Sequence, residues 1–421
     1  MAIDSSLERG RRRPRPARGA ATAFAALIVA LASCGGGDGA PTAGTGVERA
    51  AAPAGTGEPA AASLPGCTLV ERGFGPAGTV AVRVEEVASG LEVPWGLAFL
   101  PGGDLLVTER PGRLRLVAGG RLVPEPVATV EAAARGEGGL LGLALHPEFA
   151  DNRLFFLYLT AGGRGRAQNR IERWRLAEDA RSASRDRILL AGIPAASFHN
   201  GGRLRIGPDR MLYAGTGDAG DPELARDPRS PAGKLLRLTL DGEVPPDNPI
   251  AGSAAYLTGI RNTQGFDWSG DGSVWLVDHG PSGERGRRGH DEVNVARAGD
   301  DLGWPAVYGC ETGDGLVTPA LTWERAAPPG GAAIYTGSAI PEWRGSLLVG
   351  TLGSRHLHRV VFSEREPGRV ARHEVYFESG GYGRLREVVM GTDGELYVTT
   401  SNCDGRGSCP AAGDRILRVT R

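Results

Sequence analysis

A short strand, a Gly- or Asp-containing turn and a second strand recur about six times along the chain, and such a repeat restricts the fold to a few architectures. Within 203–218, Leu204 and Ile206 alternate before a Gly-Pro-Asp turn, and Met211 and Tyr213 alternate after it. The first strands of successive units begin roughly 40 to 80 residues apart, as in propeller blades with inserted loops. The repeat predicts an all-β chain folded as a propeller, with ligand loops at one mouth of its channel. The units cover 96–117, 141–176, 203–240, 265–296, 345–362 and 385–420.

The N-terminus has the composition of an export signal. Six arginines lie between residues 9 and 18, and the apolar run 20–32 that follows is too short to span a membrane. The run ends in Leu-Ala-Ser-Cys, which looks like a bacterial lipobox, so we expect 1–33 to be a lipoprotein signal peptide and Cys34 to carry the lipid. Plain cleavage by the ordinary signal peptidase is the alternative. The sequence thus predicts an exported protein of a bacterial cell envelope that faces the periplasm and meets the membrane only through its N-terminal lipid.

The composition changes again after the signal. Residues 34–63 are rich in Gly, Ala, Pro and Thr and cannot bury a core, which predicts a flexible tether. We expect the remaining residues, 64–421, to form the propeller domain. The formal net charge of the whole chain is −1, which argues against a nucleic-acid partner, because such proteins carry a basic face.

Motifs of other enzyme classes receive no support. The segment 215–220 spells GxGxxG, but the residues after it are broken by three prolines and cannot form the long helix of a βαβ unit. We therefore expect 215–220 to be a blade loop. The sequence contains no P-loop and no GxSxG nucleophile motif.

Four cysteines remain besides Cys34, and an exported chain meets an oxidising compartment, which favours two disulfides. Three pairings are possible. Cys403 and Cys409 close a short loop and are predicted to form a local bridge, and Cys67 and Cys310 would then tie the N-terminal segment to the domain. A zinc site is the alternative, although CxxC and a His at finger spacing are both missing.

The stretch 259–305 surrounds a predicted strand at 273–277 with polar groups on both flanks, as expected where rigid blades support functional loops. Its motifs, with three others, are RNTQG (261–265), DHGP (278–281), DEVN (291–294), GWP (303–305), GEGGLLGLALHPEF (136–149), FHNGGRLRIGPD (198–209) and GRLREVV (383–389). Together and in this order they resemble the soluble, pyrroloquinoline-quinone (PQQ)-dependent glucose/sorbosone dehydrogenase family of aldose sugar dehydrogenases. The resemblance extends over roughly residues 85 to 421.

The resemblance implies a fold, an activity and two cofactors. The fold would be a six-bladed propeller of four-stranded antiparallel blades. The activity would be oxidation of an aldose sugar at its anomeric hydroxyl to the lactone, with hydride passing to PQQ and on to an external electron acceptor. Ca²⁺ would hold PQQ and would be bound by the backbone carbonyls of Gly280 and Pro281, since oxygen ligands suit this hard cation.

His199 and Arg261 are the catalytic residues that the resemblance implies. His199 would take the proton of the substrate hydroxyl as a general base. Arg261 would contact the cofactor and stabilise the negative charge that develops on a quinone oxygen. Without the resemblance, a hydrogen-bonded structural His and an Arg paired with a surface acid are the alternatives.

The same resemblance implies further cofactor contacts. PQQ carries three carboxylates, so converging arginines are expected, and Arg384 and Arg386 share one face of a strand because they are two residues apart. Asn262 would donate a hydrogen bond to a quinone oxygen. The other candidates are Glu137, in a Gly-rich loop, and His279, which replaces an amide side chain of the glucose-oxidising members.

Two positions depart from the family pattern. Phe198 stands where glucose-oxidising members have an Asp, so another residue must orient the imidazole of His199. Gly353 stands near the position of a lysine that contacts the cofactor, and Arg355 is the nearby cation that could replace it. Two alternative functions remain: a non-catalytic binding module, and a calcium-dependent lactonase, which would need several side-chain carboxylates at the metal.

Overall fold

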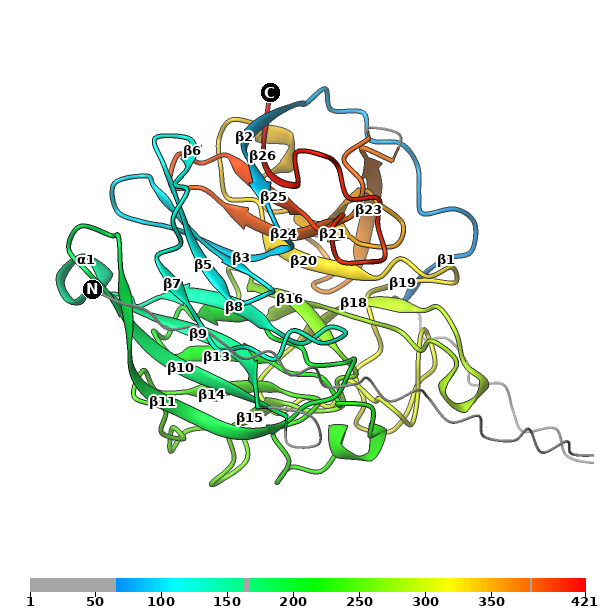
Figure 1. Cartoon of the computed structure of the whole chain (residues 1–421). Coiled ribbons are helices and arrows are strands. Elements are labelled where there is room, and N and C mark those ends of the chain that lie inside the picture. Colours follow the sequence, from blue (N-terminus) through cyan, green and yellow to red (C-terminus); the bar gives the residue numbers. More distant parts are fainter. Residues whose placement is uncertain (1–65, 163–166, 379–380) are drawn as a thin grey trace, which may run out of the picture. The chain divides into compact units, whose positions relative to one another are not determined.

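The computed structural model describes residues 66–162, 167–378 and 381–421. Its strands form six sheets, which are antiparallel apart from one added strand and are arranged as a six-bladed β-propeller (Figure 1). Four sheets have four strands and two have five. The predicted propeller is confirmed. The signal 1–33, with the tether 34–63 that begins at Cys34, lies outside the described residues, so these remain predictions.

Each sheet is built outward from an innermost strand. Contacts join β3 to β8, β8 to β12, β16 to β20, β20 to β24 and β24 back to β3, and β13 to β16, so the innermost strands form a ring. The innermost strands are β3 (Pro94–Phe99), β8 (Leu140–Leu145), β12 (Leu204–Ile206), β16 (Thr263–Trp268), β20 (Pro329–Ile334) and β24 (Leu385–Met390).

The other strands complete the blades. They are β4 (Leu105–Glu109), β5 (Arg113–Ala118), β6 (Arg121–Leu122) and β7 (Ala128–Thr129) beside β3; β9 (Leu154–Ala161), β10 (Gln168–Leu176) and β11 (Ala183–Pro194) beside β8; β13 (Leu212–Gly215), β14 (Leu235–Leu238) and β15 (Ala255–Leu257) beside β12; β17 (Val274–Asp278), β18 (Asp291–Ala296), β19 (Leu321–Trp323) and β1 (Thr68–Val70) beside β16; β21 (Leu347–Thr351), β22 (Leu357–Phe362) and β23 (Val370–Tyr376) beside β20; and β25 (Leu396–Thr400), β26 (Asp414–Thr420) and β2 (Arg83–Leu91) beside β24. The short helices are α1 (Phe149–Asn152), η1 (Pro222–Ala225), η2 (Glu284–Gly286) and η3 (Pro341–Trp343).

The two ends of the domain close the ring. β2 runs antiparallel to β26, with Arg83 opposite Thr420 and Leu91 opposite Asp414. The outermost strand of the last blade therefore comes from the N-terminal side of the domain. Its ladder of hydrogen bonds keeps the blade from separating from the chain that begins the ring.

Alternating apolar residues build the core between neighbouring blades. Leu141 of β8 and Tyr158 of β9 pack with Leu204 and Leu212 of the next blade. Close approach needs glycine at Gly142, because a Cβ there would lie 2.0 Å from a backbone oxygen of the loop before β12. Packing of this kind holds the ends of the innermost strands, and the loops that lead into them, at fixed positions.

Two disulfides join the four cysteines of the described chain, Cys67 to Cys310 and Cys403 to Cys409. Both predicted pairings are confirmed, and the zinc alternative is wrong because all four sulfurs are used. The first bridge fastens the segment that contains β1 to the loop after β18. In the described residues we find no helix that is both long enough and apolar enough to cross a membrane.

Candidate active site

Several of the predicted site residues lie at the beginnings of four innermost strands, and His279, Gly280 and Pro281 follow β17. Glu137 precedes β8, His199 precedes β12, Asn262 precedes β16, and Arg386 lies in β24. The Oε2 atom of Glu137 accepts a 2.9 Å hydrogen bond from the His199 backbone N–H, and it lies 3.5 Å from Nδ2 of Asn262. Arg386 in turn donates to Gln264 at 3.1 Å. Segments more than 120 residues apart in sequence thus meet at one mouth of the propeller.

His199 is buried and its imidazole is oriented by Asp218. Nδ1 lies 2.7 Å from Oδ1 of Asp218, a carboxylate that also accepts hydrogen bonds from Trp304 Nε1 at 2.9 Å and from Gly220 N at 2.8 Å. An ionised carboxylate only accepts, so Nδ1 carries the proton and Nε2 keeps its lone pair. Asp218, from the loop 215–220, therefore orients the imidazole. It takes this role in place of the Asp that glucose-oxidising members have at the position of Phe198.

The backbone of His199 adopts the left-handed conformation, with φ at 58°. Residues with a side chain rarely adopt it, and they do so mainly where the surroundings enforce it, often at functional sites. Here the hydrogen bond from its N–H to Glu137 helps to hold it. Burial by itself would raise the pKa of Glu137. The pKa is nevertheless lowered to about 2, because the effects of His279, of the His199 N–H and of Arg406 outweigh burial.

His279 is held as a neutral ring beside Asn262. Its Nε2 donates to the carbonyl of Pro329 at 2.7 Å, and its Nδ1 lies 3.4 Å from Nδ2 of Asn262, which can donate to it. Burial lowers the pKa of His279 to about 4, so the ring is uncharged near neutral pH. The backbone N–H groups of Arg261 and Asn262 donate to Asp278 at 2.8 and 2.6 Å, which orients both side chains.

Arg261 is buried, with 2% of its surface exposed. Its Nη2 donates to Glu284 at 2.5 Å and its Nη1 to the His279 carbonyl at 3.4 Å, while Nε has no partner among the described residues. The guanidinium lies over the ring of Trp304, 5.5 Å from its centre. A positive charge is thus fixed beside Glu284 and His279.

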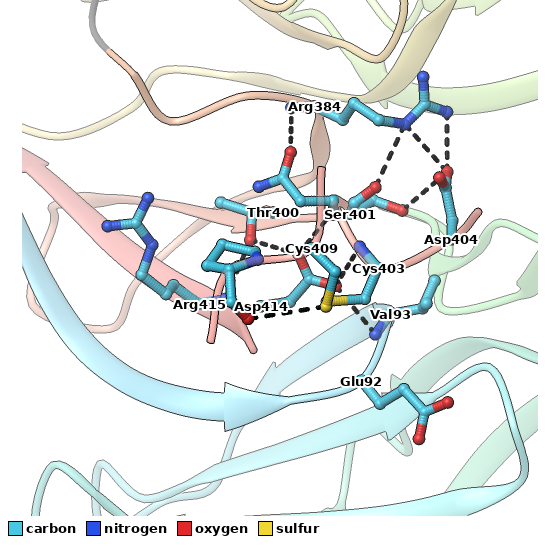
Figure 2. Close-up of a disulfide and its surroundings, with 12 residues drawn as sticks. Glu92, Val93, Arg384, Thr400, Ser401, Cys403, Asp404, Cys409, Asp414 and Arg415 are labelled. Carbon is cyan, nitrogen blue, oxygen red and sulfur yellow. Dashed lines mark hydrogen bonds and ion pairs between the residues drawn. A yellow bond between two sulfur atoms is a disulfide. The ribbon is translucent and has the colours of Figure 1, made fainter. Parts of the chain in front are cut away.

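A cluster of arginines lies beside these groups. Arg384 pairs with Asp404 at 2.8 Å, next to the Cys403–Cys409 disulfide (Figure 2). Arg386 is equally buried but forms no ion pair within the described chain, and it donates only to Gln264 at 3.1 Å and Ser401 at 3.4 Å. Burial, together with the nearby Arg384, lowers the pKa of Arg386 to about 9.

Arg110 adds to this positive charge. It precedes β5 and lies close enough to Glu137, Arg384 and Asp404 to interact electrostatically with them. Burial lowers the pKa of Arg110, and no ion pair forms to it in the part of the chain that the structure describes. Burying a cation without an anionic partner costs free energy. The cluster is therefore suited to a ligand with several carboxylates.

The Gly280–Pro281 step lies in a turn rich in buried negative charge. Asp291 accepts hydrogen bonds from Gly280 N at 3.0 Å and Ala327 N at 2.6 Å, and burial raises its pKa to about 6. Burial likewise raises the pKa of Asp278, which lies two residues before Gly280, to about 6. No group of three or more His, Cys, Asp or Glu side chains suited to a metal occurs in the described residues.

The two departures from the family pattern lie at the edge of the site. Phe198 is 42% exposed, and its ring meets the His199 ring edge-on at 4.7 Å between centres. Gly353 is exposed and lies against Pro328, and Arg355 is exposed as well. Neither position adds a cation to the arginine cluster.

Sequence reasoning missed three residues of this mouth, Asp218, Arg110 and Glu284. Asp218 lies in a Gly-rich loop that was assigned no role beyond a turn. Arg110 and Glu284 also lie in loops, and their sequence context gives no periodic signal. A rule that asks for an acid near each candidate base would have pointed to Asp218, but only as one of several acids.

The fold and this mouth define a class of protein: a six-bladed propeller with a buried His–carboxylate pair beside clustered arginines. Comparison with known proteins gives the family. The family model described as Glucose / Sorbosone dehydrogenase matches residues 91–417. The chain belongs to this family, as predicted.

Individual relatives agree with the family model. The chain is 33% identical over 350 residues to aldose sugar dehydrogenase YliI of Escherichia coli K12, which covers 77% of this chain and 91% of that protein. It is 30% identical over 261 residues to quinoprotein glucose dehydrogenase B of Acinetobacter calcoaceticus, covering 54% and 53% of the two chains. The PQQ-bound structure of an aldose sugar dehydrogenase from Streptomyces coelicolor is 36% identical, with a TM-score of 0.71 and coverage of 82% and 99%. The prediction of an oxidoreductase of the sugar dehydrogenase type is confirmed.

Proposed function

We propose that this protein oxidises an aldose at its anomeric hydroxyl to the lactone, with PQQ and Ca²⁺ as cofactors and an external electron acceptor. The observation that carries the proposal is the pairing of two features at one mouth. The buried His199–Asp218 pair is suited to proton abstraction. Beside it, Arg386 is buried without an ion pair in the described chain.

The arginine cluster fits PQQ on physical grounds. Arg386 is buried and without an ion pair in the described chain, so a carboxylate of a ligand would relieve the cost of its burial. Arg384 and Arg110 would hold further carboxylates, and Asn262 would donate to a ring oxygen. When bound, PQQ supplies a two-electron acceptor for the hydride that leaves the sugar.

The proton of the sugar hydroxyl would go to Nε2 of His199. Asp218 accepts a hydrogen bond from the Nδ1–H group, which leaves the Nε2 lone pair free and stabilises the imidazolium that forms. Glu137 holds the backbone of His199 at the mouth through its N–H. The general base is thus positioned before substrate arrives, which lowers the cost of orientation.

Arg261 would act as the electrostatic partner of this proton transfer. Its charge is permanent and buried, so it is poorly screened by water. A cation there favours negative charge on a neighbouring oxygen more strongly than an exposed Arg would. His279 and Asn262 would line the same side as neutral groups.

Ca²⁺ belongs to the same proposal, with the carbonyl oxygens of Gly280 and Pro281 as ligands. Support comes from the acids around this turn. Asp278 and Asp291 accept only N–H hydrogen bonds in the described chain and have no cationic partner. A divalent cation nearby would balance their charge, which is a reason to expect an oxygen-ligating ion here.

We also propose that the protein is exported and anchored through a lipid on Cys34, with its mouth open to the periplasm. Its two disulfides suit an oxidising compartment. There an external acceptor could take the electrons after each turnover.

The proposal is tested by dye-linked oxidation of a panel of aldoses by the purified domain, with and without added PQQ and Ca²⁺. We expect turnover that needs both additions and a product that hydrolyses from lactone to aldonic acid. Absence of PQQ binding and of turnover on every sugar would refute the proposal and leave a binding module as the better description.

A further inference from the structure

One carboxylate beside the proposed base has no part in the mechanism above. Glu284 belongs to η2, within the segment 282–289, and its Oε1 lies 3.9 Å from Nε2 of His199. The same oxygen accepts the 2.5 Å hydrogen bond from Nη2 of Arg261. A single carboxylate oxygen therefore contacts the guanidinium and faces the free nitrogen of the base.

We propose that Glu284 is a specificity-determining residue that favours amino sugars over neutral sugars and disfavours sugar acids. The inference rests on the proposed function, in which the reacting hydroxyl binds at Nε2 of His199. A hydroxyl at hydrogen-bond distance from that nitrogen can approach Glu284 closely, because Oε1 is 3.9 Å away. Substituents on the adjacent sugar carbon then meet the field of this carboxylate.

The charges around the base point the same way. Arg261 pairs with Glu284, and Arg406 pairs with Glu137 at 3.0 Å, but the contacts of Asp218 are His199 and N–H donors. The surroundings of His199 therefore keep a negative excess, whereas the unpaired arginines belong to the side assigned to the cofactor. The carboxylates around His199 are Glu137 at its backbone N–H, Asp218 at Nδ1 and Glu284 at Nε2.

The segment holds Glu284 in place before any substrate binds. The backbone N–H of Ser282 donates to its other carboxylate oxygen, Oε2. Gly283 and Gly286 have φ values of 136° and 76°, which only glycine adopts readily, and Arg287 donates to the Pro305 carbonyl at 3.1 Å. The side chain of Glu284 is still 29% exposed, so a sugar can reach it.

The test uses three aldoses of one stereochemistry that differ in charge: glucosamine, glucose and glucuronate. kcat/KM is measured for each with the PQQ-loaded protein and with Glu284→Gln, at a pH where the amine is protonated. Glu223→Gln is the matched control, because Glu223 pairs with Arg285 of the same segment on its exposed side.

We expect Glu284→Gln to lower the ratio of kcat/KM for glucosamine to that for glucuronate by about tenfold or more, because the attraction of the protonated amine and the repulsion of the sugar carboxylate are both removed. Glu223→Gln should leave the ratio unchanged. The ratio compares two substrates of one preparation, so partial loading or partial unfolding cancels. An unchanged ratio in Glu284→Gln would overturn the inference. If the PQQ-loaded wild-type protein oxidised none of the three sugars, the proposed function itself would be refuted.

Discussion

The two ring nitrogens of His199 have different neighbours. Asp218 lies 2.7 Å from Nδ1, whereas Nε2 lies 3.9 Å from a carboxylate oxygen of Glu284. The buried carboxylate thus decides which nitrogen can accept a proton. The orientation of the His199 imidazole thus depends on a second residue that lies 19 positions later in the chain.

We expect Asp218→Asn to lower kcat by about 100-fold, since an amide no longer fixes the tautomer or stabilises the imidazolium. KM and the dissociation constant for PQQ should change little, because the side chain of Asp218 contacts His199, Gly220 and Trp304 and no residue of the arginine cluster. Steady-state dye-linked kinetics measure kcat and KM, and a PQQ titration measures the dissociation constant. Asp221→Asn is the control, as Asp221 lies on the same loop but caps η1. A normal kcat in Asp218→Asn would contradict this role.

Arg386→Gln should weaken PQQ binding by about 10- to 100-fold, which corresponds to loss of a charge-assisted hydrogen bond of about 1.5–3 kcal/mol. The cofactor-free protein should not lose stability, because the variant removes a buried cation that has no ion pair in the described chain. Fluorescence titration with PQQ and thermal unfolding of the apoprotein check the two parts. Arg372→Gln, an exposed arginine of β23, is the control. Equal affinity in Arg386→Gln would exclude Arg386 from the cofactor site.

At the scale of elements, the loop closed by Cys403 and Cys409 carries two residues of the mouth. Asp404 pairs with Arg384 (Figure 2). Arg406 pairs with Glu137. The Cys403–Cys409 disulfide therefore restricts a loop that pairs with Arg384 and Glu137, two of the proposed cofactor contacts. The Cys67–Cys310 bridge holds the N-terminal segment instead.

We expect the double variant Cys403→Ser, Cys409→Ser to bind PQQ about tenfold more weakly, since the loop would lose its constraint and Arg384 part of its support. The matched control is Cys67→Ser with Cys310→Ser. That bridge spans 243 residues of sequence, so its loss should cost more stability but leave the affinity for PQQ unchanged. Equal affinities in both double variants would contradict the assignment.

The segment after β1 packs against a row of three histidines, of which His356 and His358 are buried and His373 is half-buried. Phe74 lies 5.0 Å from His356, and ring centres of His356, His358 and His373 follow one another at 5.4 and 5.3 Å. Both nitrogens of His358 lack a hydrogen-bond partner among the described residues. Burial lowers the pKa of all three, that of His356 to about 4, so the folded protein favours the neutral rings.

A His with a lowered pKa in the folded state contributes stability above its unfolded pKa of about 6.5, and this is lost as pH falls towards the folded pKa. We expect the free energy of unfolding to fall between pH 7 and pH 5, by about 2 kcal/mol from His356 alone. Chemical denaturation at both pH values measures it. His358→Phe keeps an aromatic ring and should reduce the pH dependence. An identical dependence in the variant would show that other groups are responsible.

Local sequence patterns were enough to predict the blades but not all of the site. Leu204 and Ile206 indicate a strand because apolar and polar side chains alternate within a few residues. Asp218 could not be recognised in this way, since its value depends on a contact with His199 that only the tertiary structure creates. The same holds for Arg110, which reaches the arginine cluster from a different blade. The family resemblance supplied His199, Arg261 and the other predicted residues, whose roles remain proposals.

At the scale of the whole molecule, the mouth exists only when the ring is closed. Its residues come from between Arg110 and Arg406, and the ring is completed by β2 pairing with β26 (Figure 1). A ligand that contacts several blades at once binds the closed ring and not the unfolded chain. Binding and global stability are therefore linked.

We expect PQQ with Ca²⁺ to raise the melting temperature, with a stabilisation of about 2.7 kcal/mol at a free PQQ concentration of 100 times the dissociation constant. Removal of Ca²⁺ with a chelator should reverse part of the shift, if Gly280 and Pro281 hold the ion. Differential scanning calorimetry of apo, PQQ-loaded and chelated protein measures the shifts. Stoichiometric PQQ binding without any change in melting temperature would contradict a site shared between blades.

In the proposed mechanism, His199 would take the proton of the sugar hydroxyl, and the arginine cluster would hold PQQ, which supplies the hydride acceptor. The most direct measurement is a single turnover: PQQ-loaded protein is mixed with an aldose without an electron acceptor, and the PQQ absorbance is followed. Wild-type protein should reduce its PQQ stoichiometrically, and His199→Asn should bind PQQ equally well but reduce it at least about 100-fold more slowly. Reduction at the same rate in both proteins, or no reduction in the wild type, would contradict the account.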